Sequence, residues 1–291
     1  DEVADNRLFV QAKQMDMAGT EVGTFNDRIR EAIRGGAFFS NNATDGNLSE
    51  QDTLRLSLAG NLQNYILKDF KGNSAKGSSF SWSGQPAAYA LDPADSINYV
   101  SKHDNETLWD QLQYKHGTNL SIEERVRVHN MALAMPLMSQ GIPFMQMGAD
   151  MLRSKSMDRN SYDSGDWFNF VDFSKETNNW NVGLPPAQDN QAKWGEIAPI
   201  SANSNAQAMA SDIEYASNVF TEFLAIRSAS PLFSLTTEQD ILDRVGFHNI
   251  GKRQQQGLVV MSIDDGVGLT DLDSQYDAIV VVMNGTEQTL S

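Results

Sequence analysis

The chain has 291 residues, of which 40% are hydrophobic, and a formal net charge of −16 at pH 7. The length accommodates about two folding units, and the charge argues against nucleic acid or an anionic membrane surface as a partner, because both require clustered Lys and Arg. The absence of cysteine excludes disulfides, and no apolar run approaches the roughly 20 residues that cross a bilayer.

The first third of the chain predicts helices joined by short polar or extended segments. Asn26 is a residue that caps helices, and Gly35 is one that ends them. We interpret the arginines between them as a solvated helix face that carries ion pairs with Asp27 and Glu31. Helices are expected over residues 1–19, 27–34 and 51–66.

Residues 40–49 are rich in Asn, Asp, Gly and Ser and predict a loop. Calcium binds oxygens of this kind, but the spacing lacks the ligand pattern of an EF-hand. A plain polar loop is therefore the favoured interpretation, and calcium cannot be assigned. No cofactor is predicted, and no His/Asp/Glu cluster has zinc spacing.

The middle of the chain predicts a strand, two helices and a second strand. The first strand begins at Ile97, and a helix follows from Thr107. Ser121 and Glu124 form a capping box that starts a long apolar helix ending near Ser139. A buried strand is expected over 142–147, parallel to the first as in a βαβ unit.

The first of these strands ends in the cluster Lys102-His103-Asp104-Asn105. Barrel enzymes and other α/β enzymes keep their chemistry at the carboxyl ends of strands. Asp104 is equally suited to an ordinary helix N-cap, as are Asn105 and Thr107. On composition alone both interpretations stay open.

Residues 151–195 show no periodicity and are dense in Arg, Asn, Asp, Tyr and Trp. So long an irregular segment is usually functional or disordered, and its aromatic residues argue against disorder. Its side chains suit a carbohydrate, and equally many other polar ligands. Further on, a helix is predicted over 212–228, followed from residue 231 by an all-β region with strands over 242–247, 258–263 and 278–283.

Five segments resemble type I pullulanases, which are α-1,6-glucosidases of the α-amylase superfamily. The resemblance covers nearly the whole chain in the right order. The segments are Thr24-Phe25-Asn26-Asp27-Arg28, Tyr99-Val100-Ser101-Lys102-His103-Asp104-Asn105, Leu152-Arg153-Ser154-Lys155-Ser156, Ser161-Tyr162-Asp163-Ser164-Gly165-Asp166-Trp167-Phe168-Asn169 and Ser230-Pro231-Leu232-Phe233.

The resemblance implies an α/β fold in two domains. Residues 1–230 would be the C-terminal part of a catalytic (β/α)8 (TIM) barrel, and residues 231–291 an incomplete small antiparallel β-sandwich domain. It also implies a retaining, debranching glycoside hydrolase that cleaves α-1,6-glucosidic linkages in pullulan, amylopectin or limit dextrins, and so takes part in starch degradation. The substrate partner would be an α-glucan.

The resemblance also assigns site residues. Asp104 matches the carboxylate that stabilises the distorted sugar in the transition state, and His103 would hydrogen-bond the same sugar. The remaining matches line sugar subsites, although relatives carry Asp at the position of Asn160. They are Asn105, Arg159, Asn160 and Tyr162.

The family's nucleophile Asp and its Gly-Glu-Gly-Trp acid motif do not occur in this sequence. A retaining glycosidase needs both, so we expect the 291 residues to be a fragment that is inactive alone and whose partner is the N-terminal remainder of the parent enzyme. The alternative is a non-catalytic carbohydrate-binding or structural fragment. We favour an extracellular or cell-surface location over a cytoplasmic one.

Overall fold

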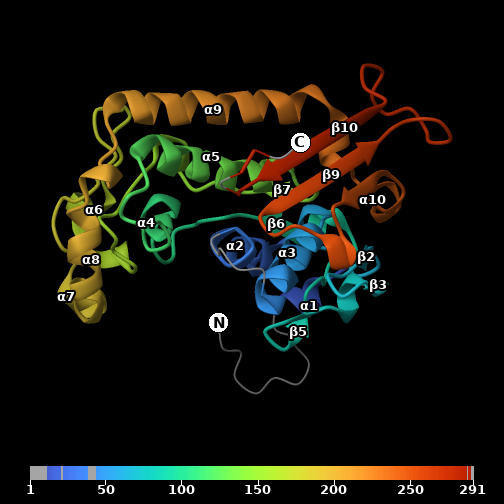
Figure 1. Cartoon of the computed structure of the whole chain (residues 1–291), viewed down its shortest axis with the longest axis horizontal. Helices are drawn as coiled ribbons and strands as arrows, with labels where there is room; N and C mark the ends of the chain where they lie inside the picture. The colour runs from blue at the N-terminus through green and yellow to red at the C-terminus, as the bar shows by residue number, and fades with distance from the viewer. Residues whose placement is uncertain (1–11, 21, 39–43, 287, 290–291) are drawn as a thin grey trace. The chain divides into compact units, whose positions relative to one another are not determined.

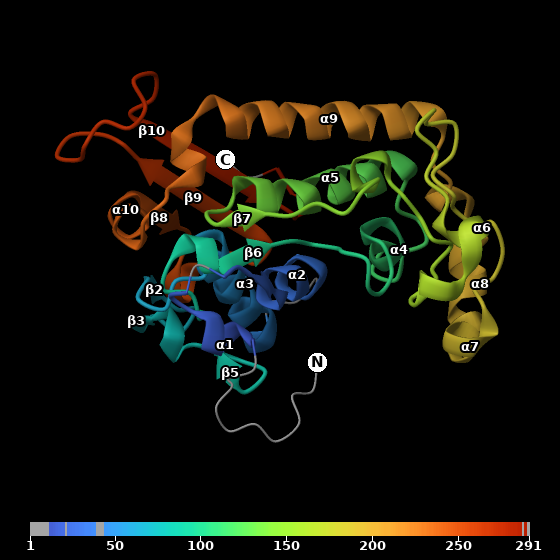
Figure 2. The same ribbon diagram turned by 180° about the vertical axis from the view of Figure 1, so that it is seen from behind.

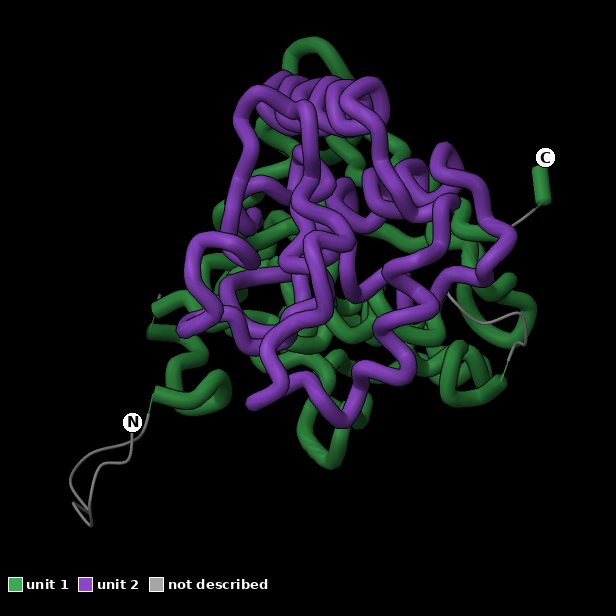
Figure 3. Tube along the Cα trace, turned by 90° about the vertical axis from the view of Figure 1, so that its left-hand side faces the viewer, with its two compact units in different colours: residues 1–99, 138–144, 230–291 green, residues 100–137, 145–229 purple. Residues whose placement is uncertain are grey.

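The computed structural model describes residues 12–20, 22–38, 44–286 and 288–289, and the chain forms two compact units. Figure 3 colours them separately: unit 1 holds residues 1–99, 138–144 and 230–291, and unit 2 holds residues 100–137 and 145–229. Both units contain segments distant in sequence. The expected domain boundary at residue 231 stays a prediction.

A three-stranded parallel sheet lies in unit 1, with the strand order β1-β6-β7. Its members are β1 (Thr24–Asn26), β6 (Ser96–Asn98) and β7 (Ile142–Pro143), labelled in Figures 1 and 2 where there is room. The parallel pairing of β6 with β7 confirms the expected βαβ order. The predicted buried strand over 142–147 is wrong in length and burial: β7 has two residues and Ile142 is 45% exposed, because β7 is an edge strand.

Buried amides join β1 to β6, and β6 to the segment that leads into β7. The Asn98 Nδ2 donates to Ser139 Oγ at 2.8 Å and to the Gln140 carbonyl at 2.7 Å, while its Oδ1 accepts from Asn26 Nδ2 at 2.9 Å. Asn26 also caps α2 (Asp27–Arg34), as predicted, by accepting from the Arg28 N–H. One side chain thus serves both the sheet and the helix that follows it.

The predicted solvated arginine face on α2 is wrong for Arg34, which is 8% exposed, and still more so for Arg28. The Arg28 side chain is fully buried, and its guanidinium lies 4.8 Å from the ring centroids of both Trp82 and Tyr89. It also donates to the Pro86 carbonyl at 3.0 Å. A weakly hydrated, planar guanidinium tolerates such an aromatic environment better than most charges do.

Two further helices of unit 1 differ from expectation. The helix α3 (Asp45–Leu58) begins inside the predicted loop, because the Thr44 side chain accepts from the Asn47 N–H and starts the helix there. It also ends well before residue 66. Of the helix expected over 1–19, residues 1–11 lie outside the described residues, and α1 covers Gln14–Met17. Residues 40–43 of the predicted loop also lie outside the described residues.

Unit 1 also holds an antiparallel sheet with the order β10-β9-β8. The strands β9 (Leu258–Asp264) and β10 (Ala278–Asn284) confirm two predicted strands. The third prediction, 242–247, is partly wrong, since α10 (Glu238–Arg244) precedes β8 (Val245–His248). The remaining strands form two short hairpins: β2 (Ile66–Lys68) with β3 (Ser74–Lys76), and β4 (Ser81–Trp82) with β5 (Gln85–Pro86).

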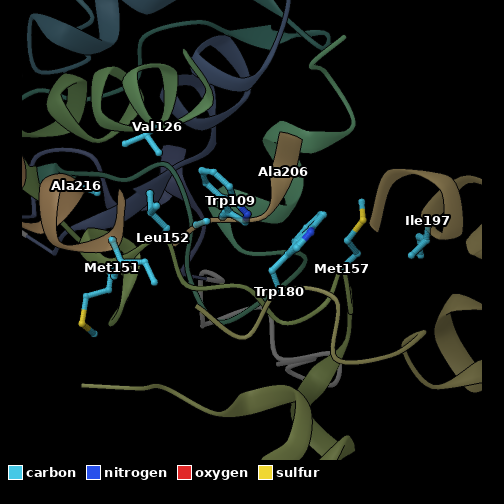
Figure 4. Packing of buried hydrophobic residues seen from close by; sticks show 11 residues of the cluster. Trp109, Val126, Met151, Leu152, Met157, Trp180, Ile197, Ala206 and Ala216 are labelled. Carbon is cyan, nitrogen blue, oxygen red and sulfur yellow. The ribbon is translucent and has the colours of Figure 1, made fainter. Parts of the chain in front are cut away.

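Unit 2 is helical and packs around a cluster of buried apolar side chains, most of them labelled in Figure 4. Trp109, Met157 and Ile213 come from three distant segments and meet in this cluster. Its helices are α4 (Leu108–Gln113), α5 (Ile122–Met138), α6 (Gly165–Asn169), α7 (Ala187–Asn190), α8 (Trp194–Ser201) and α9 (Ala210–Ala229). The Ser121 capping box is present: Ser121 N donates to Glu124 Oε2, and Glu124 N donates to Ser121 Oγ.

Short 3₁₀ turns complete the chain. They are η1 (Gly77–Ser79), η2 (Pro93–Asp95), η3 (Ala149–Met151), η4 (Ser161–Asp163), η5 (Gln191–Lys193), η6 (Ser204–Ala206), η7 (Pro231–Ser234) and η8 (Gly251–Arg253). None of the helices in the described part of the chain has the length and apolar character needed to span a membrane.

Candidate functional site

The start of α4 shows whether Asp104 caps this helix. Thr107 is the N-cap: its Oγ1 accepts from the backbone N–H of Asp110 at 3.2 Å. A helix has one N-cap residue, so neither Asp104 nor Asn105 fills that position. The carboxylate of Asp104 is left for other interactions.

Asp104 lies in a short polar loop between β6 and α4, with 55% of its side chain exposed. The Lys102 ammonium donates to Asp104 Oδ2, and the His103 Nε2 lies 3.2 Å from Oδ1. Lys102 is mostly buried whereas His103 is 81% exposed. Each carboxylate oxygen therefore has one basic neighbour and also access to solvent.

The hydrogen bond from Lys102 holds the pKa of Asp104 below its ordinary value, and the charges of Lys102, His103 and Lys155 act in the same direction. Partial burial opposes this effect but does not outweigh it. Asp104 is consequently an ionised carboxylate at neutral pH. Such a group accepts hydrogen bonds strongly and is a poor proton donor.

A buried lysine holds the backbone of this loop. Lys155 is 2% exposed, and its ammonium donates to the Asn105 carbonyl at 2.7 Å. Asn105 has a φ of 62°, in the left-handed region that Asn tolerates better than most residues. The charged donor fixes the carbonyl next to Asp104, although burial lowers the pKa of Lys155.

The lysine segment is itself anchored by Asp110 of α4, which is fully buried. Its carboxylate accepts hydrogen bonds from Ser154 Oγ, from the Lys155 N–H at 2.8 Å and from the Met157 N–H at 3.1 Å. Burial raises the pKa of Asp110 to about 6, against these three hydrogen bonds. Asp110 thus joins α4 to the segment that carries Lys155.

Arg159 and Asn160 lie just before the turn η4, and Tyr162 lies within it. A second buried aspartate organises this segment. Asp158 Oδ1 accepts from the Asn160 N–H at 2.9 Å and from Asn190 Nδ2 at 3.0 Å. The Arg159 N–H donates to Asn190 Oδ1 at 3.1 Å. The backbone is therefore held while all three side chains are exposed, Tyr162 to 79%.

The structure brings some predicted residues together and leaves others apart. Lys102, His103 and Asp104 form one contact group. Among the described residues, the side chains of His103 and Asp104 form no hydrogen bond or ion pair with Arg159, Asn160 or Tyr162. The connection runs through Lys155, whose ammonium reaches the Asn105 carbonyl and whose own carbonyl accepts from the Asp158 N–H at 3.0 Å.

Sequence reasoning assigned no role to Lys155, Asp110 or Asp158. Lys155 was part of a recognised segment, but nothing near it in sequence shows that it reaches the Asp104 loop. Within the part of the chain that the structure describes, no group of three or more His, Asp or Glu side chains is placed to hold a metal ion. What the residues offer is one exposed ionised carboxylate beside a rigid polar loop.

Comparison with known proteins identifies relatives along the whole chain. Residues 175–291 match the family described as alpha-1,6-glucosidases, pullulanase-type, C-terminal. Pullulanase 1, chloroplastic, of Arabidopsis thaliana is 40% identical and aligns with 100% of this chain and 33% of its own length. Klebsiella pneumoniae pullulanase is 39% identical over 97% of this chain and 28% of its own length.

A solved structure shows the same relationship. The crystal structure of Klebsiella pneumoniae pullulanase complexed with maltotriose superposes with a TM-score of 0.91 at 39% identity, over 95% of this chain and 28% of that one. The present chain therefore spans about a third of the length of the relatives it matches. It is related throughout to pullulanases, and its residues 175–291 belong to the C-terminal family of pullulanase-type α-1,6-glucosidases.

Proposed function

We propose that this chain supplies one catalytic carboxylate and part of the sugar-binding surface of a retaining α-1,6-glucosidase that acts on α-glucans. The observation that carries the proposal is the state of Asp104. It is ionised, exposed and not used to cap α4. The nearby Asp110 and Asp158 are instead fully buried, and their carboxylates accept hydrogen bonds from the surrounding chain. The relatives' names point to the same activity.

In this proposal Asp104 stabilises the distorted sugar. Glycoside cleavage passes through an oxocarbenium-like transition state. Hydrogen bonds from ring hydroxyls to an ionised carboxylate that strengthen in that state lower the barrier, because only differential binding accelerates a reaction. His103, which faces the other carboxylate oxygen, would bond the same sugar.

The other predicted residues would bind neighbouring sugars. The Lys155 ammonium donates to the backbone carbonyl of Asn105. The side-chain amide of Asn105 would therefore bind a sugar hydroxyl. Arg159 and Asn160 present polar groups on a held backbone, and Tyr162 presents an exposed ring on which the apolar face of a sugar can stack. The maltotriose named for the Klebsiella pneumoniae complex is a ligand of this class.

We also propose what the sheets correspond to. The parallel strands β1, β6 and β7 would be the last three strands of a (β/α)8 barrel, with residues 1–230 as its C-terminal part. The antiparallel strands β8 to β10, within residues 231–291, would belong to a C-terminal β-sandwich domain. The parallel order and register of the first sheet are consistent with neighbouring barrel strands.

The nucleophile and the acid/base would come from the N-terminal remainder of a parent enzyme. Alone, the 291 residues should release no maltotriose from pullulan, because neither leaving-group protonation nor a covalent intermediate is available. Measurable release by the purified chain would contradict this.

A chimera tests the catalytic role. The segment of Klebsiella pneumoniae pullulanase that aligns with this chain is replaced by the chain, and maltotriose release from pullulan is measured. We expect activity, and Asp104→Asn should lower kcat by about a thousandfold, as when a preorganised electrostatic contact is lost. Asp271→Asn, at an exposed position of unit 1, is the control and should leave kcat unchanged. A folded chimera in which Asp104→Asn retains full activity would exclude the proposed role.

A non-catalytic carbohydrate-binding function is the second candidate. It is favoured by exposed aromatic side chains in one short segment, namely Tyr162, Trp167 and Phe173. Dextrin binding by the chain together with an inactive chimera would support it. The absence of any sugar binding would favour a structural fragment instead.

The cellular location remains a prediction. The Arabidopsis thaliana relative is named as chloroplastic. For this chain we keep the expectation of an extracellular or cell-surface location, which targeting signals in the complete parent sequence would test.

A further inference from the structure

Unit 1 carries a basic depression that the proposed sugar-cleaving function does not use. Its volume is about 420 Å³, which falls within the range of small-molecule sites. The hairpin β2–β3 and the turn η8 form it. The lining residues are Lys68, Gly72, Ile250, Gly251, Lys252 and Arg253.

Two lysine–glycine contacts hold the depression in shape. A Cβ placed on Gly72 would lie 3.2 Å from Lys252 Cε, and one placed on Gly251 would lie 3.4 Å from Lys68 Cε. Each lysine stem thus packs on the glycine of the opposite loop. Both glycines have positive φ, 91° and 75°, so a side chain at either position is strained whatever the space.

A buried ion pair on α3 anchors both loops. Asp52 and Arg55 form a salt bridge of 2.8 Å and are almost completely buried. Asp52 Oδ2 accepts from the Phe70 N–H at 2.8 Å, in the hairpin turn, and Arg55 Nη2 donates to the Asn249 carbonyl at 2.8 Å, just before η8. The cationic side chains therefore project from a preorganised backbone.

The cations of the depression lack a carboxylate. In the described part of the chain no salt bridge includes Lys68, Lys252 or Arg253. Asp69, which follows Lys68 in the sequence, accepts hydrogen bonds from the backbone N–H of Asn73 at 2.7 Å and from the side-chain amide of Asn73. Three exposed basic residues thus line one depression in a protein whose net charge is −16. A bound anion would relieve their mutual repulsion.

We propose that this depression binds a small phosphate ester, of the sugar-phosphate class. Two ammonium groups and a guanidinium suit a phosphate, since charge-assisted hydrogen bonds are strong and the Arg fork matches phosphate oxygens. The volume exceeds what one phosphate needs and leaves room for a sugar. Ile250 and the two glycines offer an apolar surface for a ring face. The proposal does not depend on the cleavage activity, because all lining residues belong to unit 1 and binding needs no catalysis.

Isothermal titration calorimetry of the purified chain tests this, with glucose 6-phosphate as probe and glucose and inorganic phosphate as separate arms. We expect glucose 6-phosphate to bind with a Kd of about 1 mM or below, inorganic phosphate to bind more weakly, and glucose not to bind at this site. No binding of glucose 6-phosphate would overturn the proposal. Equal affinity for inorganic phosphate would overturn the assignment to an ester.

Variants locate the binding. Lys252→Met and Lys68→Met keep the stems that pack on the glycines and remove the charge, and each should weaken glucose 6-phosphate binding about tenfold, as for one lost charge-assisted hydrogen bond. Arg253→Gln should do the same. Lys76→Met is the matched control, because the Lys76 ammonium donates to Asn64 Oδ1 and does not line the depression. Unchanged affinity in the first three variants, or an equal loss in the control, would place binding elsewhere.

Discussion

Asp104 and Asp110 are close in sequence and carry the same side chain, yet the fold treats them in opposite ways. Asp104 is more than half exposed and has its pKa lowered by the Lys102 ammonium. Asp110 is fully buried, accepts three hydrogen bonds and has its pKa raised to about 6. One carboxylate stays exposed to solvent, and the other joins α4 to the segment of Lys155.

The contrast shows that burial can outweigh a full set of hydrogen bonds. At Asp110, the free-energy cost of removing the charged carboxylate from water exceeds the stabilisation from its hydrogen bonds to two backbone N–H groups and a hydroxyl. At Asp104, water remains close, and one charged donor is sufficient to favour ionisation. Substitution of Asp110 should therefore change the stability of the fold, and substitution of Asp104 should change the proposed activity.

The largest expected effect is on stability, from Asp110→Ala. The change leaves Ser154 Oγ and the N–H groups of Lys155 and Met157 without their acceptor, and each unsatisfied buried group costs about 1–3 kcal/mol. We expect the free energy of unfolding, measured by urea denaturation of the chain, to fall by about 3–5 kcal/mol. The matched change Asp104→Ala should alter it by less than about 0.5 kcal/mol. Equal losses of unfolding free energy in the two variants would contradict the different structural roles of Asp110 and Asp104.

The second effect is a pH dependence from Asp110. Its pKa rises from 3.8 to about 6 on folding, so the folded state binds a proton more tightly than the unfolded state does. The contribution of Asp110 to the free energy of unfolding is fully present below pH 4. It falls by about 3 kcal/mol as the pH rises from 4 to 6, and it is constant above that. Asp104 acts with the opposite sign, because its lowered pKa adds stability above its ordinary pKa that is lost at more acidic pH.

Denaturation curves of the wild type and Asp110→Asn between pH 4 and 7 separate the contributions. The variant should lose the decline between pH 4 and 6 while keeping the remaining pH dependence. An identical pH profile for the two proteins would mean that Asp110 does not titrate in this range.

A smaller effect is expected from Lys155→Met, which removes the ammonium from the Asn105 carbonyl while keeping the stem. One charged hydrogen bond is lost, but the cost of burying the charge is also removed, so stability should change by about 1 kcal/mol. The pKa of Asp104, followed by NMR titration of its carboxyl carbon, should rise because the Lys155 charge helps to lower it. Lys193→Met is a control at a half-exposed lysine that is not among the causes of the Asp104 shift. A rise of the same size in that control would mean that general charge, not Lys155, is responsible.

The smallest change in stability should follow Lys102→Met, since the Lys102–Asp104 contact has an exposed partner. We expect less than about 0.5 kcal/mol in unfolding free energy. The same variant should raise the Asp104 pKa more than Lys155→Met does, because the Lys102 hydrogen bond is the leading cause of the shift. An unchanged Asp104 titration would exclude Lys102 as that cause.

Local signals predicted much of the fold correctly. The Asn26 cap, the Ser121 capping box and the alternating strands β9 and β10 depend on residues a few positions apart, and the structure confirms them. Where local signals competed, the prediction failed. The polar segment before α3 contained both loop-forming residues and a capping threonine, and the cap at Thr44 prevailed.

For the site, the sequence by itself determined the candidate residues: the Lys102-His103-Asp104-Asn105 cluster and the segment around Tyr162. Only the tertiary structure decided which carboxylates are exposed and which are buried and hydrogen-bonded. Asp110 accepts from Ser154, which is 44 positions away, and Lys155 reaches Asn105 across 50. Burial and long-range hydrogen bonds set the charge and exposure of each carboxylate, and neither can be read from neighbouring residues, because both arise only when distant segments pack together.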